Sequence, residues 1–479
     1  MAARRSATTP AERSSRSVER PPTAAERSAD QTDLLGERAV ELSRYFAGKI
    51  ETVPKVPVRS LEDFSLWYTP GVAAVSRAIH SEPDRSFDLT GRWNTIAIVT
   101  DGSRVLGLGD IGPEAALPVM EGKALLFKVL GGVDAIPIPV RTRSPEEFIA
   151  TVEALAPAFG GINLEDIASP KCFGILEELS ARLPIPVWHD DQLGTAAATV
   201  AGLLNAFALT HRSVANVRTV LLGAGAANLA TARLLLALGH PARTLTLVDQ
   251  KGILHAERDD MDELEFHHRW KYRVALATNG GGRTGDLASA LADADVLVAA
   301  STPDPNAVRA DHVRSMAKDP IVFALANPVP EIWPDVARSA GAAIVATGRS
   351  DFPNQVNNSL IFPGVFRGIL DARARSVPDE VVLAAAQELA RGAARQGLSK
   401  EHLLPTMEEG DVFPEIAAAV GDTAVRLGIA RKRLSHDEFL ERARTLMGRP
   451  ARLVRALARA RLTPPMPPPH PPQRRRNLR

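Results

Sequence analysis

The sequence has little cysteine, few aromatic side chains and almost no net charge. The single cysteine, Cys172, excludes an internal disulfide and fits a reducing compartment. Its place in an acidic stretch predicts a small buried side chain and not a nucleophile. The 57 basic residues nearly balance the 56 acidic ones, so the body of the protein lacks the field that would attract nucleic acid or a membrane surface. We therefore expect a cytoplasmic protein that binds neither.

Long hydrophobic runs are also missing. No apolar stretch reaches the roughly 18 residues that cross a bilayer. The nearest, residues 196–209, is interrupted by Thr199, Gly202 and Asn205. The sequence therefore predicts no membrane-spanning segment.

Both ends of the chain lack the apolar residues of a core. Residues 1–30 are rich in Ser, Arg and Ala but contain acidic residues, so they fit neither a secretory signal nor a transit peptide. Their composition predicts a disordered tail. Residues 463–479 are dense in proline and then basic, which favours an extended tail; a partner-binding motif is the alternative.

Between the tails, the apolar residues predict an α/β fold. Short apolar runs separated by amphipathic stretches indicate βαβ units and a parallel sheet within residues 197–446. These runs lie at 219–222, 244–248, 296–300, 321–325 and 342–346. Residues 31–196 form a less regular α/β domain, with a strand over 96–99 and a helix over 113–130. The pattern from 379 to 446 predicts C-terminal helices packed on the body.

Two acidic pairs follow apolar runs that predict short buried strands. Glu165 and Asp166 come after residues 159–164, and Asp190 and Asp191 come after residues 185–188. Strand ends are where sites are built, and carboxylate oxygens suit Mg²⁺ or Mn²⁺. The pairs therefore predict a metal site. The alternative is that the first pair caps a helix N-terminus and the second lies in an ordinary turn.

A nucleotide-binding turn is predicted by the segment TVLLGAGAANLATARLLLALG. Gly223 would make the tight turn after a strand, and Gly225 would let the backbone approach a pyrophosphate at the start of the helix, around Ala226 and Ala227. The third glycine of this Rossmann pattern is replaced by Asn228, which either sits in a wider helix crossing or contacts the cofactor itself. A glycine-rich turn of another kind of α/β protein is the alternative.

The cofactor preference stays open from the sequence. Asp249, at the end of the next strand, would accept a hydrogen bond from the adenine ribose of NAD and repel the 2′-phosphate of NADP. Lys251 and Arg243 lie nearby in the sequence and could instead accommodate that phosphate.

Several longer segments are similar to the motifs of one enzyme family and come in the same order as in that family. They are YTPGVA from Tyr68, TDGSRVLGLGDIGPEAALPVMEGKALLF from Thr100, FGGINLED and HDDQ, FALANPVPEI from Phe323, and ATGRSDFPNQVNNSLIFPG from Ala346. From about Gln31 to about Leu446 the chain resembles a malic enzyme of the shorter bacterial type. The resemblance implies a substrate domain followed by a Rossmann-type NAD(P)-binding domain, and a homodimer or higher homo-oligomer. It also implies oxidative decarboxylation of (S)-malate to pyruvate and CO₂ with NAD or NADP and Mg²⁺ or Mn²⁺.

The resemblance also implies roles for individual residues. It gives Glu165, Asp166 and Asp191 as metal ligands, with Asp190 beside them. Lys123 matches the general base, which requires that burial and positive neighbours lower its pKa. Tyr68 matches the acid that protonates C3 of enolpyruvate, with Lys123 as its expected hydrogen-bond partner.

Three further residues match groups that hold the substrate carboxylates. They are Arg104, Asn327 and Asn358, and Asn327 would also lie beside the nicotinamide. The chain departs from the family pattern at Leu193, where a polar residue is usual, and at Asn228. A malolactic-type or oxaloacetate-decarboxylating relative, or a nucleotide-binding scaffold that has lost turnover, are the alternative functions.

Overall fold

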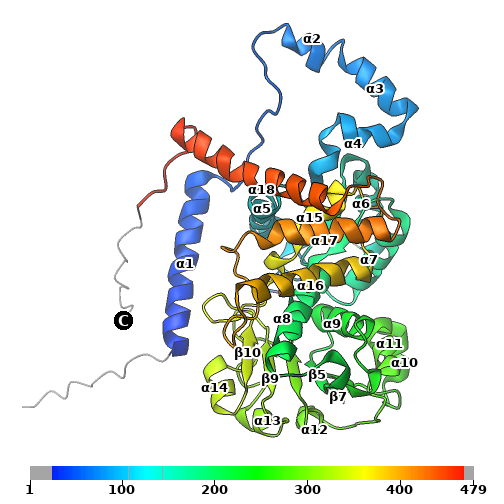
Figure 1. Cartoon of the computed structure of the whole chain (residues 1–479), viewed down its shortest axis with the longest axis vertical. Helices are drawn as coiled ribbons and strands as arrows, with labels where there is room; N and C mark the ends of the chain where they lie inside the picture. Colours follow the sequence, from blue (N-terminus) through cyan, green and yellow to red (C-terminus); the bar gives the residue numbers. More distant parts are fainter. Residues whose placement is uncertain (1–23, 106, 143, 469–479) are drawn as a thin grey trace, which may run out of the picture. The chain divides into compact units, whose positions relative to one another are not determined.

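The computed structural model describes residues 24–468 except 106 and 143, in two compact units (Figure 1). The smaller unit holds the helix α1 (Ala24–Phe46) and the segment from Thr463. Within it, the Arg38 guanidinium donates to the carbonyl oxygen of Pro467. Because α1 begins at Ala24, the last part of the predicted N-terminal tail is helical, as its Ala and Glu residues favour. Residues 1–23 and 469–479 of the predicted tails lie outside the described residues.

The larger unit, Ile50–Leu462, contains two sheets. The first sheet is wholly parallel and has the order β2-β1-β3-β4. Its strands are β1 (Thr95–Thr100), β2 (Asp134–Pro139), β3 (Gly161–Leu164) and β4 (Val187–His189), and its helices are α5 (Gly112–Gly131), α6 (Pro145–Leu155) and α7 (Lys171–Arg182). Helix α5 ends at Gly132, which adopts the left-handed conformation at φ 63°. This sheet confirms the predicted α/β character of the N-terminal half.

The second sheet has the order β10-β9-β8-β5-β6-β7 and is parallel except for its edge strand β7. Its strands are β5 (Thr219–Leu222), β6 (Leu245–Asp249), β7 (Gly252–Ile253), β8 (Val296–Ala299), β9 (Ile321–Ala324) and β10 (Ile344–Thr347). The helices between them are α9 (Ala226–Ala237), α10 (Met261–His267), α11 (Arg269–Ala277), α12 (Leu287–Leu291), α13 (Ala310–Arg314) and α14 (Pro334–Ser339). Five of the strands match the predicted apolar runs; the two-residue β7 has no such run and was not predicted.

The remaining long helices lie between and beside the two sheets (Figure 1). They are α8 (Thr195–Leu209), α15 (Phe362–Asp371), α16 (Asp379–Gln396), α17 (Val412–Arg426) and α18 (His436–Arg459). Helix α18 begins at a capping box between Ser435 and Glu438 and continues past the predicted end at Leu446. The helical stretch Asp190–Leu209 is long and apolar enough to cross a membrane, but 78% of it is buried inside the protein, as expected of a core helix.

The short elements include an exposed arm near the N-terminus. Helices α2 (Asp63–Trp67) and α3 (Val72–Ser81) contain no buried residue and project from the sheets in Figure 1. The other short elements are α4 (Ser86–Leu89), η1 (Pro83–Arg85), η2 (Gly91–Asn94), η3 (Ala156–Ala158), the π-helical turn η4 (Asp190–Gly194), η5 (Val214–Asn216), η6 (Ala242–Thr244) and η7 (Asn358–Leu360).

Candidate active site

Three carboxylates converge at one edge of the first sheet. Glu165 and Asp166 directly follow β3, and Asp191 follows the neighbouring strand β4. One carboxylate oxygen from each lies within 4.8 Å of the other two. The next helix after Asp166 begins only at Lys171, so the alternative of a helix N-cap is wrong. Parallel strands deliver these groups to the same edge, which confirms the predicted convergence.

Hydrogen bonds fix the positions of these carboxylates. The Asn163 amide donates to Glu165 Oε2 at 2.9 Å, and the Trp188 indole donates to Asp190 Oδ1 at 2.8 Å. The backbone N–H of Asp166 donates to Asp191 Oδ2 at 3.0 Å. Neither Asn163 nor Trp188 was expected at the site from the sequence. Asn163 carries a visible signal, because it is the polar residue within an otherwise apolar strand.

Lys123 reaches these carboxylates from α5. Its Nζ lies 3.0 Å from Glu165 Oε1, also donates to Asp190 Oδ2, and lies 4.3 Å from the centroid of the Phe362 ring. Burial lowers the pKa of Lys123, but attraction and hydrogen bonds from Asp190 and Glu165 outweigh burial and raise that pKa above its ordinary value. The expectation of positive neighbours that lower it is wrong, because both polar neighbours are acids.

Negative charge is in excess around Lys123 and Glu165. Burial raises the pKa of Glu165 well above its ordinary value, and repulsion from Asp190, Asp191 and Asp166 adds to this, against the attraction of Lys123. Four carboxylates are thus close enough to interact, and the Lys123 ammonium bonds to two of them, Glu165 and Asp190. Oxygen donors crowded in this way are the donor set of a hard divalent cation, so Glu165, Asp166 and Asp191 fit Mg²⁺ or Mn²⁺.

Of the three residues expected to bind substrate carboxylates, Arg104 and Asn358 lie beside this edge, and Asn327 lies at the end of β9 in the second sheet. The backbone N–H of Arg104 donates to the carbonyl oxygen of Asp166 at 3.0 Å, and the Arg104 side chain is exposed. Asn358 packs against the turn of Asp190, since its Cβ lies 2.9 Å from the position of a Cβ added to Gly194. Asn327 follows β9 and donates to the carbonyl oxygen of Gly348 at 3.3 Å.

A cleft of about 660 Å³ lies at the carboxyl ends of β5, β6 and β8. Gly223 has φ 94° and a Cβ there would meet the carbonyl oxygen of Ala300 at 2.4 Å, so only glycine fits. Gly225 is the N-cap of α9, and no atom lies within 4 Å of its added Cβ, so the backbone is open to a ligand. Ala226 and Ala227 form the first turn of α9. Arg104 lines the same cleft, which therefore extends to the carboxylate edge.

Asp249, the last residue of β6, lines this cleft and forms ion pairs with two cations. Its Oδ1 accepts from Arg258 Nη1 and from the backbone N–H of Lys251, both at 2.9 Å, and its Oδ2 lies 3.4 Å from Lys271 Nζ. Among the described residues that line the cleft, Arg243 is absent. Lys251 does line the cleft, but its ammonium pairs with Asp260 at 3.1 Å and Glu263 at 3.0 Å. The cations whose side chains contact Asp249 are Arg258 and Lys271, which were not expected from the sequence.

The two departures from the family pattern are both buried. Asn228 is 1% exposed and its amide donates to the carbonyl oxygens of Leu222 at 2.8 Å and Val298 at 3.4 Å. It therefore ties α9 to β5 and β8 and does not face the cleft. Leu193 is 3% exposed and belongs to the hydrophobic core.

Tyr68 does not meet Lys123 among the residues that the structure describes. It lies between α2 and α3 on the exposed arm, and 69% of its surface is accessible. In the part of the chain that the structure describes, the hydrogen bonds of Lys123 go to Glu165 and Asp190 and not to Tyr68. The expected Tyr68–Lys123 pair is not formed within one chain.

Comparison with known proteins agrees with this geometry. The sequence profile of the malic enzyme N-terminal domain matches residues 47–145, and that of the malic enzyme NAD binding domain matches residues 193–425. The chain is 46% identical over 413 residues to a bifunctional malic/malolactic enzyme of Bacillus subtilis, covering 86% of this chain and 98% of that protein. It is 47% identical over 388 residues to an NAD-dependent malic enzyme of Geobacillus stearothermophilus, covering 81% and 79%.

Solved structures show the same similarity. The malic enzyme of Entamoeba histolytica superposes with a TM-score of 0.89 at 39% identity, covering 93% of each chain. The malic enzyme of Pyrococcus horikoshii superposes with a TM-score of 0.84 at 44% identity, covering 89% of this chain and 99% of that one. The resemblance inferred from the motifs is confirmed: the chain belongs to the malic enzyme family of NAD- or NADP-dependent decarboxylating oxidoreductases.

Proposed function

We propose that this protein oxidatively decarboxylates (S)-malate to pyruvate and CO₂, reduces NAD or NADP, and depends on a divalent metal. One observation carries the proposal. Arg104 lines the nucleotide cleft, and its backbone is hydrogen-bonded to Asp166 among the carboxylates, so the proposed cofactor and metal sites would be adjacent at this residue. A substrate bound there would lie between the two sites, as hydride transfer requires.

Each group then has a role. Glu165, Asp166 and Asp191 would hold Mg²⁺ or Mn²⁺, which when bound polarises the C2 oxygen and stabilises the enolate left when CO₂ departs. Arg104 would pair with a malate carboxylate, because a guanidinium can donate two parallel hydrogen bonds. Asn358, beside the Asp190 turn, and Asn327, after β9, would donate to the substrate carboxylates from the other side.

Lys123 would move the proton of the C2 hydroxyl. Its two carboxylate partners keep it charged, so it accepts that proton only after passing its own proton on. Asp190 is the adjacent acceptor, since it already shares a hydrogen bond with Lys123 and is fully buried. We propose this pair as the proton relay of the reaction.

The cofactor would bind along the glycine turn. Gly223 and Gly225 leave room for the pyrophosphate, and the N-terminal amides of α9 at Ala226 and Ala227 would donate to it. Asp249 would accept from the adenine ribose. Arg258 and Lys271 offset its charge, so either NAD or NADP fits the arrangement.

Tyr68 would reach Lys123 from a second copy of the chain. The arm that carries Tyr68 exposes large apolar side chains close together, as is common at protein–protein interfaces. They include Leu61 at 86%, Leu66 at 66% and Trp67 at 48% exposure. A homodimer or higher homo-oligomer that covers this arm would bury them and complete the site. We also propose a cytoplasmic location, which the lone buried Cys172 supports.

A mixing experiment tests this arrangement. Lys123→Ala and Tyr68→Phe homo-oligomers, each impaired, are mixed, dissociated and reassembled. In a dimer with crossed arms, half of the molecules are mixed and each has one complete site, so about a quarter of the wild-type activity returns. No recovery, with mixed dimers verified by differential tags, would show that Tyr68 acts in its own chain or not at all.

A malolactic activity is the second candidate. It is favoured by the Bacillus subtilis relative, whose name includes that activity. The same sites would then yield lactate without net change in the cofactor. Product analysis separates the two: pyruvate formed in proportion to NADH or NADPH supports the first function, and lactate without net reduction supports the second.

The decisive assay follows reduction of NAD and, separately, NADP with (S)-malate and Mn²⁺. Reduction that EDTA abolishes, with matching pyruvate, supports the proposed function and settles the cofactor. Cofactor binding without malate-dependent reduction or product would instead support a scaffold that has lost turnover.

A further inference from the structure

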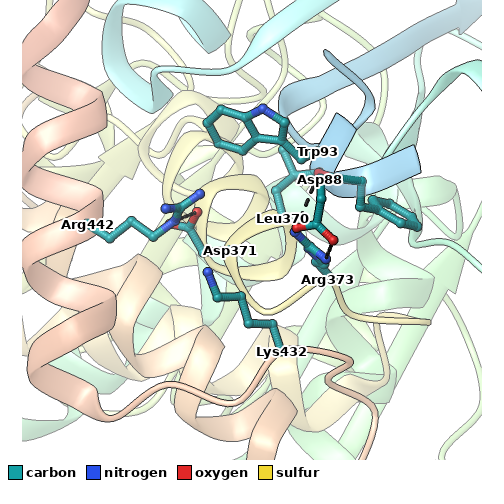
Figure 2. Close-up of a pocket in the computed structure, with 8 residues that line it drawn as sticks. Asp88, Trp93, Leu370, Asp371, Arg373, Lys432 and Arg442 are labelled. Carbon is teal, nitrogen blue, oxygen red and sulfur yellow. Dashed lines mark hydrogen bonds and ion pairs between the residues drawn. The ribbon is translucent and has the colours of Figure 1, made fainter. Parts of the chain in front are cut away.

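A second cavity lies away from the carboxylate edge and the nucleotide cleft. Its volume is about 210 Å³ and it shares no lining residue with that cleft (Figure 2). Its wall combines three separate parts of the chain: α4 and η2, the C-terminal end of α15, and α18 with the segment before it. Three cations, Arg373, Lys432 and Arg442, line it against two carboxylates, Asp88 and Asp371.

Both carboxylates are already paired. Asp371 accepts two hydrogen bonds from Arg367, at 2.9 and 2.8 Å, and one from Arg442 Nε at 2.6 Å. Asp88 accepts from both terminal nitrogens of Arg373, one of them at 3.1 Å. Lys432 attracts Asp88 only at longer range, because among the described residues no hydrogen bond or ion pair joins its ammonium to either carboxylate.

Lys432 is the cation without a partner. Among the described residues no hydrogen bond or ion pair is formed by its ammonium, although the side chain is half-buried. Figure 2 shows this ammonium on the side of the Arg442–Asp371 pair, pointing toward it, with the Arg373–Asp88 pair across the cavity. A partly desolvated ammonium of this kind gains most from an anion that enters the cavity.

The surroundings of the cavity are crowded with positive charge. Among the described residues, the buried Nε of the neighbouring Arg431 has no hydrogen-bond partner, and it lies 3.6 Å from Asp84 Oδ2. Burial lowers the pKa of Arg431, and repulsion from Arg375, Arg92 and Arg373 lowers it further, against the attraction of Asp84. Positively charged side chains therefore outnumber carboxylates in and around the cavity.

Two aromatic rings hold the cations in place. The Arg442 guanidinium lies 5.1 Å from the Trp93 ring centroid, and the Arg373 guanidinium lies 5.7 Å from that of Phe87. Such contacts keep the donors ordered before a ligand arrives. The cavity is smaller than the roughly 300–1,000 Å³ of pockets for drug-sized ligands, so it suits a compound of few heavy atoms.

We propose that this cavity is a binding site for a small oxyanion, carrying a carboxylate or phosphate group, with Lys432 as its principal charged contact. The ligand would connect α4 and η2 to α15 and α18. The site does not depend on the proposed catalytic function, because its binding can be measured without malate, nucleotide or metal.

Calorimetric titration of the full-length protein tests the proposal, with inorganic phosphate and succinate as separate probes. Wild type is compared with Lys432→Ala and with the control Arg433→Ala, which removes an exposed cation at the next position. Losing a charged hydrogen bond should weaken binding of at least one probe by about tenfold or more in Lys432→Ala and leave Arg433→Ala unchanged. Which probe binds tells whether the natural ligand is a phosphate or a carboxylate compound.

Localisation comes from tryptophan fluorescence. A probe-dependent change in wild type that disappears in Trp93→Phe, while calorimetry still shows binding, places the ligand in this cavity. Two results would overturn the proposal: neither probe binds wild type, or Lys432→Ala, shown by its melting temperature to be folded, binds both probes as tightly as wild type. Binding at the nucleotide cleft would not mimic the expected result, because Lys432 does not line that cleft.

Discussion

The carboxylate edge and the exposed arm carry motifs of the same family, yet the fold treats them in opposite ways. At the edge, Lys123, Glu165 and Asp190 are nearly inaccessible and bonded to one another. On the arm, Tyr68 is 69% exposed and lies next to other exposed apolar residues. A single chain therefore completes the metal half of the candidate site and leaves its acid half open. The difference shows that motifs of one family can be packed together or left apart within a single chain.

The largest expected effect comes from removing the buried side chain of Lys123. Lys123→Ala should lower kcat by about 10²- to 10⁴-fold, because a proton-transfer group is lost. It should also destabilise the metal-free protein by about 3–5 kcal/mol, since Glu165 and Asp190 remain buried without their ammonium partner. Steady-state kinetics and denaturant unfolding measure the two effects. Unchanged cofactor affinity is the control, and near-normal kcat would remove Lys123 from the mechanism.

Tyr68→Phe tests the exposed side. It should lower kcat by about 10²-fold, because a positioned proton donor is lost. The stability of the folded chain itself should change by less than about 0.5 kcal/mol, because among the described residues the Tyr68 hydroxyl has no hydrogen-bond partner within its own chain. Thermal unfolding and kinetics measured on the same preparation separate the two. A variant that loses stability but keeps its kcat would show that the hydroxyl has only a structural role.

Gly194→Ala tests the packing at the carboxylate edge without removing a charge. An added Cβ would lie 2.2 Å from Asp190 Oδ1, so the turn must shift, at a cost of about 1–3 kcal/mol in stability. Gly122→Ala in α5 is the matched control, because no atom lies within 4 Å of its added Cβ. That change should stabilise the protein by up to about 1 kcal/mol. Equal effects of the two substitutions on unfolding would contradict the packing described at Gly194.

The smallest expected effect concerns the access of solvent to the buried thiol of Cys172. Burial, with repulsion from Asp191, raises the pKa of the Cys172 thiol to about 12, so at pH 8 only roughly one thiol in ten thousand is ionised. A thiol reagent should therefore label the native protein very slowly and the unfolded protein at one site per chain. Fast labelling under native conditions would mean that this region opens.

Much of the fold followed from local patterns. The apolar runs predicted the strands because buried parallel strands need continuous apolar residues. The position of Glu165, Asp166 and Asp191 at neighbouring strand ends followed from the same pattern. The edge strand β7 was not predicted, because its two residues, Gly252 and Ile253, carry no period.

The partners of charged groups could not be predicted in the same way. Asp249 is held by Lys271, which is 22 residues away on α11, and the nearer candidate Arg243 does not line the cleft. Asn228 replaces a glycine that normally permits close packing, yet its amide takes up two backbone carbonyls and ties the helix to the sheet. Only the packed chain shows which of these contacts forms.

The sequence by itself determined the family, the α/β fold and the placement of the carboxylates and glycines at strand ends. These depend on local periodicity and on motifs whose order is visible in the chain. The tertiary structure decided which carboxylates bond to Lys123, how exposed Tyr68 is and, among the described residues, that Lys432 forms no ion pair. The physical reason is that pKa values and ion pairs depend on desolvation and on distances between groups far apart in sequence, which no local pattern fixes.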